Sequence, residues 1–189
     1  MGDTALTNLD LSASAATSFG RDAFNGCRAL PRVDFGALPV TTIGNYAFHS
    51  CTSLRHVTPL LPETVTTVGG RAFLSTPVEG SLRIGFGGTL STPNDEWGGG
   101  HQFEGTKITE IITGPGATSL GPQFAQNCRD LARADFTESL NLATLSADAF
   151  RSCPSLLEVR FASYPAFGGN VFNGVSANAR FFLALEAEG

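Results

Sequence analysis

The chain has 189 residues, enough to bury a sizeable core, and 42% of them are hydrophobic against 15% charged. Its formal net charge of −5, from 12 basic and 17 acidic residues, argues against binding to nucleic acid or to an anionic membrane surface. No apolar run approaches the ~20 residues that a membrane span needs, so we expect no transmembrane segment in this chain.

A short motif recurs along the chain and is clearest between Ile43 and Val57. Within it, Cys51, Leu54 and Val57 follow Phe48 by three, six and nine positions. Recurrence at a period of 20 to 30 residues predicts a solenoid, in which each unit buries its apolar side chains only by stacking on its neighbours. The motif has seven Phe anchors, the fifth of which fits the frame after one inserted residue: Phe24, Phe48, Phe73, Phe103, Phe124, Phe150 and Phe172.

This motif resembles the BspA-like, or Treponema pallidum-type, class of leucine-rich repeat. Residues 148–156 form a second clear copy, and the runs 73–78 and 103–108, with Thr in place of Cys, look like the family's shorter variant. Residues 171–183 look like its usual last repeat, so the resemblance covers residues 6–183. It implies a leucine-rich-repeat-like solenoid with short parallel β-strands stacked in one sheet and turns or short helical turns on the other side.

The first 11 residues begin in the middle of a repeat, because Leu6, Leu9 and Leu11 have the spacing of its strand half without the Phe half. No positively charged leader or apolar signal core precedes them. We therefore expect one repeat domain over residues 1–189 that is a piece of a longer protein; a short protein starting on an open repeat is the alternative. Residues 184–189 fall outside the repeat and are expected to be a frayed tail or the start of a following segment.

The strand half of each repeat alternates apolar and polar residues, as a half-buried strand does. The many glycines and prolines, 22 and 10, argue against sustained helices, and Thr, Ser, Gly and Pro fill the arms that connect the repeats. Strands are expected near residues 8–10, 32–34, 56–58, 81–84, 109–112, 133–135 and 158–161.

The four cysteines, Cys27, Cys51, Cys128 and Cys153, share one repeat position and are expected to be buried free thiols. Disulfides between adjacent repeats are the alternative, since the repeat spacing suits a bridge although parallel Cβ vectors aim the sulfurs badly. A zinc site of all four thiolates does not fit, because Cys51 and Cys128 lie three repeats apart, or ~14 Å.

The longest interval between anchors contains an insertion, residues 85–102, which is expected to form a protruding loop. It holds Trp97, a residue type that often anchors a protein partner. Asp95, Glu96 and His101 could instead ligate a cation. The third interpretation is a plain Gly-rich loop with the Trp folded over the flank.

Side chains that flank the central apolar residue of each strand point away from the core and line up on one exposed face. Solenoid sheets of this kind form extended binding surfaces. The alternative is that these positions are polar only because they are exposed to solvent. Pairs such as Arg32 and Asp34 could also neutralise each other. Together with Trp97, the charged positions make the expected partner-binding set: Arg32, Asp34, His56, Arg83, Trp97, Glu110, Arg133, Asp135, Glu158 and Arg160.

No catalytic constellation stands out: no serine sits in a nucleophile elbow, and Gly85–Gly88 is not followed by the Lys of a phosphate-binding loop. We expect no enzyme activity, no cofactor and no metal. The resemblance implies a cell-surface or secreted module that binds a protein, such as a host or cell-surface protein, in adhesion. The alternative is an intracellular structural or scaffolding repeat within a larger assembly.

Overall fold

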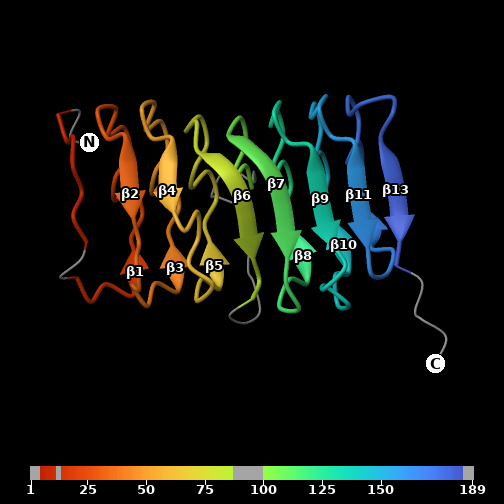
Figure 1. Ribbon diagram of the computed structural model, residues 1–189, viewed down its shortest axis with the longest axis horizontal. Coiled ribbons are helices and arrows are strands. Elements are labelled where there is room, and N and C mark those ends of the chain that lie inside the picture. The colour runs from red at the N-terminus through yellow and green to blue at the C-terminus, as the bar shows by residue number, and fades with distance from the viewer. Residues whose placement is uncertain (1–4, 12–13, 87–99, 185–189) are drawn as a thin grey trace.

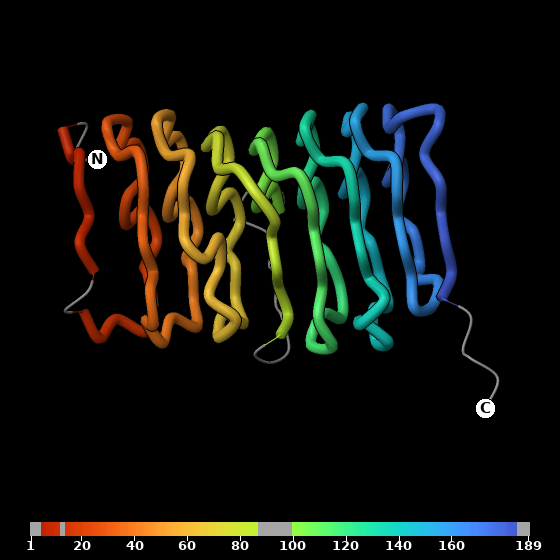
Figure 2. Tube along the Cα trace, in the orientation of Figure 1, coloured from red at the N-terminus to blue at the C-terminus, as the bar shows by residue number. Residues whose placement is uncertain are grey.

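The computed structural model describes residues 5–11, 14–86 and 100–184, which form a coil whose successive turns lie side by side (Figures 1 and 2). We call each turn of the coil a rung. A complete rung has a short back strand, a tight turn and a front strand. Figure 1 shows that the front strands run in one direction and the back strands in the other. The leucine-rich-repeat-like solenoid that the motif predicts is confirmed.

Front strands pair in parallel, and all but the last, whose four residues are exposed, place one or two apolar side chains inside the coil, as Val57 does in the middle of its strand. Turns, and no helix, connect them to the back strands in the described part of the chain. The front strands are β2 (Arg32–Asp34), β4 (His56–Thr58), β6 (Glu79–Ile84), β7 (Lys107–Thr113), β9 (Arg133–Phe136), β11 (Glu158–Phe161) and β13 (Arg180–Leu183).

Hydrogen bonding divides the front face into a two-stranded sheet, β2-β4, and a five-stranded sheet, β13-β11-β9-β7-β6. The division lies where the spacing between the two buried residues of the repeat changes. Three residues separate buried Val78 from buried Leu82. In the preceding rung only two residues separate the equivalent pair, Leu54 and Val57. Strand β6 is therefore out of register with β4, and Gly80, with φ of 101°, accommodates the extra residue.

A strand expected at residues 8–10 is absent, and that prediction is wrong. Leu6, Leu9 and Leu11 do pack against the core, as their spacing indicates. Residues 5–11 nevertheless form no ladder with β2 among the described residues.

The back of the coil is more regular than the sequence predicts. Its short strands form two three-stranded parallel sheets, β1-β3-β5 and β12-β10-β8, where turns or short helical turns were expected. Each strand has only two residues, too few to show an alternating pattern in the sequence. They are β1 (Ser18–Phe19), β3 (Thr42–Ile43), β5 (Thr67–Val68), β8 (Ser119–Leu120), β10 (Thr144–Leu145) and β12 (Ala166–Phe167).

Glycine after the back strand lets adjacent rungs approach closely. A Cβ atom at Gly69 would lie 2.4 Å from the backbone nitrogen of Asn45, and one at Gly44 would lie 2.7 Å from the carbonyl carbon of Gly20. Real Cβ atoms do not come this close to backbone, so a larger residue at either position would push two rungs apart.

The turn of every rung contains two residues in the left-handed region, one two positions before the Phe position and one two positions after it. In the second rung these are Tyr46 and Ser50, with φ of 58° and 56°. Such a conformation costs a non-glycine residue about 1–2 kcal/mol. Backbone bonds between rungs offset this cost; Phe48 N, for example, donates to Ala72 O at 2.8 Å.

The same backbone bonds show that the fifth rung has no inserted residue, which corrects the sequence alignment. Phe103 N donates to Phe124 O, and Ala125 N donates to Ala149 O, both at 2.8 Å. Ala125 therefore occupies the Phe position, and Phe124 occupies the small-residue position before it. The chain has the order Phe-Ala where the clear copies have Ala-Phe, and Cys128 then falls at the usual three positions from the anchor.

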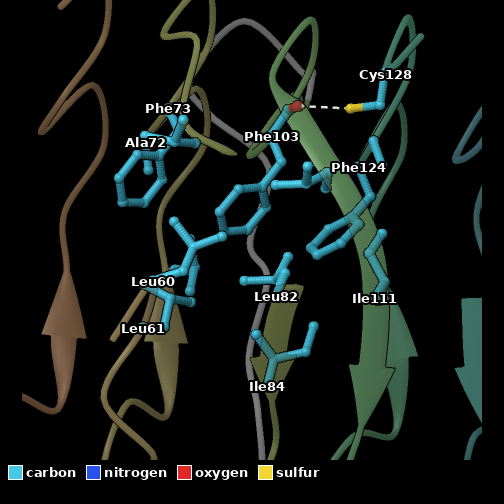
Figure 3. Packing of buried hydrophobic residues seen from close by; sticks show 14 of the residues in the cluster. Leu60, Leu61, Ala72, Phe73, Leu82, Ile84, Phe103, Ile111, Phe124 and Cys128 are labelled. Atoms are coloured by element: carbon cyan, nitrogen blue, oxygen red, sulfur yellow. Dashed lines mark hydrogen bonds between the residues drawn. The ribbon is translucent and has the colours of Figure 1, made fainter. Parts of the chain in front are cut away.

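The Phe side chains form a stack through the core. The rings of Phe48 and Phe73 are 5.2 Å apart and 9° from parallel, and those of Phe73 and Phe103 are 5.1 Å apart and 10° from parallel. Phe124 breaks this alignment and tilts by 58° against Phe103, because it enters from the neighbouring position (Figure 3). Five of the seven anchors are fully buried: Phe48, Phe73, Phe103, Phe124 and Phe150.

The anchors at the two ends, Phe24 and Phe172, are only partly buried, so the prediction that all seven are buried is wrong there. Each has a complete rung on one side only. Phe24 still stacks on Phe48 at 5.0 Å, and Phe172 stacks on Phe150 at 5.7 Å.

The four cysteines are free and buried, as expected, and the alternative of disulfides between adjacent rungs is wrong. Three thiols donate to a backbone carbonyl of the preceding rung. Cys51 Sγ donates to Phe24 O at 3.0 Å, and Cys128 Sγ donates to Phe103 O at 3.1 Å (Figure 3). Cys153 Sγ donates to Ala125 O at 3.2 Å.

Candidate functional site

The exposed side of the front strands carries two columns of side chains, which the parallel register aligns rung by rung. In the first column Glu110 and Glu158 are both paired in register with Arg133. In the second column Arg160 is in register with Asp135. We call these two columns the front face; in chain order its members are Arg32, Asp34, His56, Thr58, Ser81, Arg83, Glu110, Ile112, Arg133, Asp135, Glu158, Arg160, Arg180 and Phe182.

Arg133 is the centre of an ion-pair network over three rungs. Its guanidinium lies 2.8 Å from a carboxylate oxygen of Glu110, 2.5 Å from one of Asp135 and 3.1 Å from one of Glu158. Glu158 also pairs with Arg160 at 2.6 Å. The structure therefore brings five of the predicted site residues together, and their charges neutralise one another across rungs as well as within them.

Asp135 also holds the turn that follows its strand, β9. Its Oδ1 accepts hydrogen bonds from the backbone nitrogen of Thr137 at 3.0 Å and from the Thr137 hydroxyl at 2.7 Å. Burial acts to raise the pKa of this carboxyl, but these bonds and the nearby charges of Arg133 and Arg160 hold the pKa below its usual value. Asp34 holds the equivalent turn in the first rung, accepting from Gly36 N at 2.8 Å.

The N-terminal part of the front face is less constrained. Arg32 and His56 are adjacent in register and exposed, and neither side chain makes a hydrogen bond or ion pair with another described residue. Arg83 lies 3.8 Å from a Glu63 oxygen, and its guanidinium lies 4.2 Å from the ring centre of Phe86. This end of the face therefore offers cationic groups that are free or only loosely held.

Sequence reasoning missed the last members of the two columns. Strand β13 places Arg180 beside Glu158 and Phe182 beside Arg160, whose guanidinium lies 5.7 Å from the Phe182 ring. The signal was present, because Arg180-Phe-Phe-Leu183 has the same alternation as Glu158-Val-Arg-Phe161. It was overlooked because this copy of the motif is degenerate.

The insertion at residues 85–102 is described only at its two ends. Trp97, Asp95 and Glu96 lie outside the described residues. His101 lies in a turn, and its Nδ1 pairs with Glu104 rather than standing free. Within the described ranges, no group of three or more His, Cys, Asp and Glu side chains is arranged to hold a metal ion.

The buried thiols are poor candidates for nucleophiles. Burial raises the pKa of both Cys51 and Cys128 to about 12, so both are protonated at neutral pH. Burial also raises the pKa of Cys153. No helix in the described part of the chain has the length and apolar character needed to cross a bilayer.

Comparison with known proteins agrees with this architecture. The sequence matches the family described as BspA type leucine-rich repeat region in six copies, over residues 2–85 and 97–178. Repeats of this kind generally bind proteins, and the family and its fold are typically non-catalytic. A comparison with curated proteins found no match.

Among solved structures, the fold is similar to that of a leucine-rich repeat protein from Bacteroides ovatus ATCC 8483, with a TM-score of 0.52 and 16% sequence identity. The alignment covers 84% of this chain and 45% of that protein's chain, so this chain spans less than half the length of its structural relative. Family match and fold agree, and the chain belongs to the BspA type of leucine-rich repeat proteins.

Proposed function

We propose that the chain is a non-catalytic recognition module, secreted or displayed on the cell surface, that adheres to a protein partner through its front face. The observation that carries the proposal is the pair of aligned columns, whose side chains lie outside the stack. The proposed contact residues are Arg32, Asp34, His56, Arg83, Glu110, Arg133, Asp135, Glu158 and Arg160, with Trp97 on the insertion as a further contact.

The ion-pair network favours specificity in the choice of a protein partner more than it favours high affinity. Its charges alternate along the first column, from Glu110 to Arg133 to Glu158. A partner that presents the opposite alternation can pair with the column without leaving a charge unmatched, whereas a surface of one sign meets repulsion at every second rung. Asp135 contributes indirectly, because it holds both the turn after its strand and the guanidinium of Arg133.

The proposal is tested by differential capture. The chain, a triple variant with Arg133, Glu158 and Arg160 replaced by Gln, and a control with Arg28→Gln are immobilised separately. Each is exposed to the same preparation of cell-surface proteins. Arg28 is exposed and lies on a turn away from the front face, so its loss should not matter. We expect at least one protein that binds the parent chain and the control but not the triple variant. If the triple variant captures the same proteins as the control, the front face has no role in binding and the proposal is contradicted.

Surface display is tested separately, in the cells that make the protein. Intact cells are treated with a protease that cannot enter them, and the remaining protein is detected with an antibody. Loss of the signal from intact cells, or recovery of the protein from the medium, supports display or secretion. Protection until the cells are lysed favours the intracellular alternative and contradicts the proposed location.

A further inference from the structure

The edge of the solenoid has an indentation where two consecutive rungs lack the turn that follows the Cys position. Rungs with Cys at the conserved position place a two-residue turn after it, as Arg129 and Asp130 do in the fifth rung. The third and fourth rungs have Thr76 and Thr106 instead and continue directly toward their front strands. Strands β6 and β7 are correspondingly long, with six and seven residues (Figure 1). The missing turns leave a gap, with the turn of the fifth rung as its wall.

This gap is a groove of about 510 Å³, here called the edge groove. That volume lies within the range of ligand sites, roughly 300–1,000 Å³. Residues of three successive rungs line it: Leu74, Ser75, Glu104, Gly105, Thr106, Lys107, Asn127, Arg129 and Asp130.

Unused hydrogen-bond donors outnumber unused acceptors among the side chains of the edge groove. Both oxygens of Glu104 are occupied, one by His101 and the other by Asn127, whose Nδ2 donates at 2.9 Å. Arg129 has no hydrogen bond or ion pair with any other residue in the described ranges. Lys107 has only a loose pairing, 4.0 Å from a carboxylate oxygen of Asp130.

We propose that the edge groove binds a carboxylate group of an acidic segment in a protein partner. Arg129 supplies a planar fork of donors that matches a carboxylate, and Lys107 supplies a second positive charge beside it. Gly105 and Thr106 also line the groove, and Ser75 adds a hydroxyl from the rung before. The ligand's carboxylate would compete with Asp130 for the ammonium group of Lys107.

The charge of the whole chain favours a short acidic segment over a long polyanion. A sulfated glycan binds through an extended basic surface, and this chain has 17 acidic residues against 12 basic ones. Two cations in one groove can bind one or two carboxylates without an extended basic track. The inference rests on the proposed function in one respect, that the carboxylate belongs to a protein partner. The residues that line the edge groove are not members of the front face.

The test is a titration of the ¹⁵N-labelled chain with a capped hexaglutamate peptide, followed by NMR at constant ionic strength. Capped hexaglutamine is the neutral comparison. We expect saturable shifts centred on residues 105–107 and 129–130 with hexaglutamate alone. Arg129→Gln should raise the dissociation constant about tenfold, the effect of losing one hydrogen-bonded charge pair. Arg28→Gln is the matched control, because Arg28 holds the same repeat position next to full-length rungs and should bind as the parent does.

Several results would overturn the proposal: no saturable shift, shifts centred elsewhere, or equal losses from Arg129→Gln and Arg28→Gln. A heparin fragment that binds these residues more tightly than hexaglutamate would assign the edge groove to a glycan instead. If Arg129→Gln lowers the unfolding midpoint, Lys107→Gln takes its place with the same expected loss. The titration uses the chain without a partner, so its failure is distinct from a failure of differential capture.

Discussion

At the scale of single residues, the repeat position shared by Cys and Thr has a physical explanation. It is buried, small and close to a backbone carbonyl of the preceding rung. Cys128 Sγ donates to Phe103 O, and in the shorter rung Thr76 Oγ1 donates to Phe48 O. Both side chains supply a donor in little space, which is why the two types can replace each other. The position therefore selects for a small side chain that donates to a nearby backbone carbonyl, which for Thr106 Oγ1 is Phe103 O of its own rung.

The thiols should react slowly in the folded protein. Burial excludes the reagent and raises the pKa of Cys51 and Cys128 to about 12, so few thiolates exist at pH 8. Titration with a thiol reagent should be slow on native protein and find all four cysteines after unfolding. Fast reaction of the native protein, or fewer than four thiols after unfolding without reductant, would contradict this account.

Asp135 should make stability depend on pH. Its folded-state pKa lies below the ordinary value of 3.8, so its contribution is present above that value and is lost as the pH falls through the folded pKa. Unfolding free energies of the parent chain and Asp135→Asn should differ at pH 7 and converge at acid pH. A difference that stays constant down to pH 2 would show that the charge of this carboxylate does not contribute.

At the scale of one element, the turn of the fifth rung shows that the position of a Phe within the repeat decides how its ring stacks in the core. Phe124 is fully buried, but it sits one position early and leaves Ala125 in the position that Phe fills elsewhere. The ring stack that is nearly parallel between Phe73 and Phe103 is therefore tilted at Phe124. Phe136 packs against the next anchor, Phe150, with ring centres 6.0 Å apart.

A double substitution tests this register. Phe124→Ala alone should cost ~3–5 kcal/mol of unfolding free energy, because it removes a buried ring from a packed core. Adding Ala125→Phe should recover much of that loss, because it restores the Ala-Phe order of the other rungs. Denaturant titration measures both variants. If the double variant is no more stable than Phe124→Ala, Ala125 does not occupy a Phe position.

The sequence predicts elements well where side-chain periodicity carries the information. The front strand at residues 158–161 is found with those limits, because Val159 and Phe161 alternate with polar neighbours. The fifth turn was misaligned because Phe and Ala are both apolar and the alignment followed Phe124, although Cys128 lies the usual three positions after Ala125. Back strands of two residues have no periodicity to detect. The edge groove could have been predicted from the sequence, because two successive repeats lack the turn after the Cys position and the edge is indented there.

At the scale of the whole molecule, the front face depends on contacts that no single repeat contains. Sequence reasoning anticipated pairing within a rung, such as Arg133 with Asp135. It did not anticipate that Arg133 also binds Glu110 and Glu158, because these bonds require the register between rungs. The alternation in the sequence predicts that these positions lie on the outer side of the front strands, whereas their pairing between rungs follows from stacking.

The central claim is that interior contacts hold the stack and leave the front face available for a partner. Ion pairs that reach solvent, as the partly exposed pairs of Arg133 do, contribute little to stability, about 0–1 kcal/mol each. A buried anchor such as Phe48, with no exposed surface, should contribute ~3–5 kcal/mol when truncated to Ala.

The most direct test is the denaturant-unfolding free energy of the triple variant, with Arg133, Glu158 and Arg160 all replaced by Gln, measured beside Phe48→Ala. The account predicts that the triple variant loses no more than about 1–2 kcal/mol, whereas Phe48→Ala loses at least twice as much. A triple variant destabilised as much as Phe48→Ala would show that the network holds the fold, and would contradict a face free for binding.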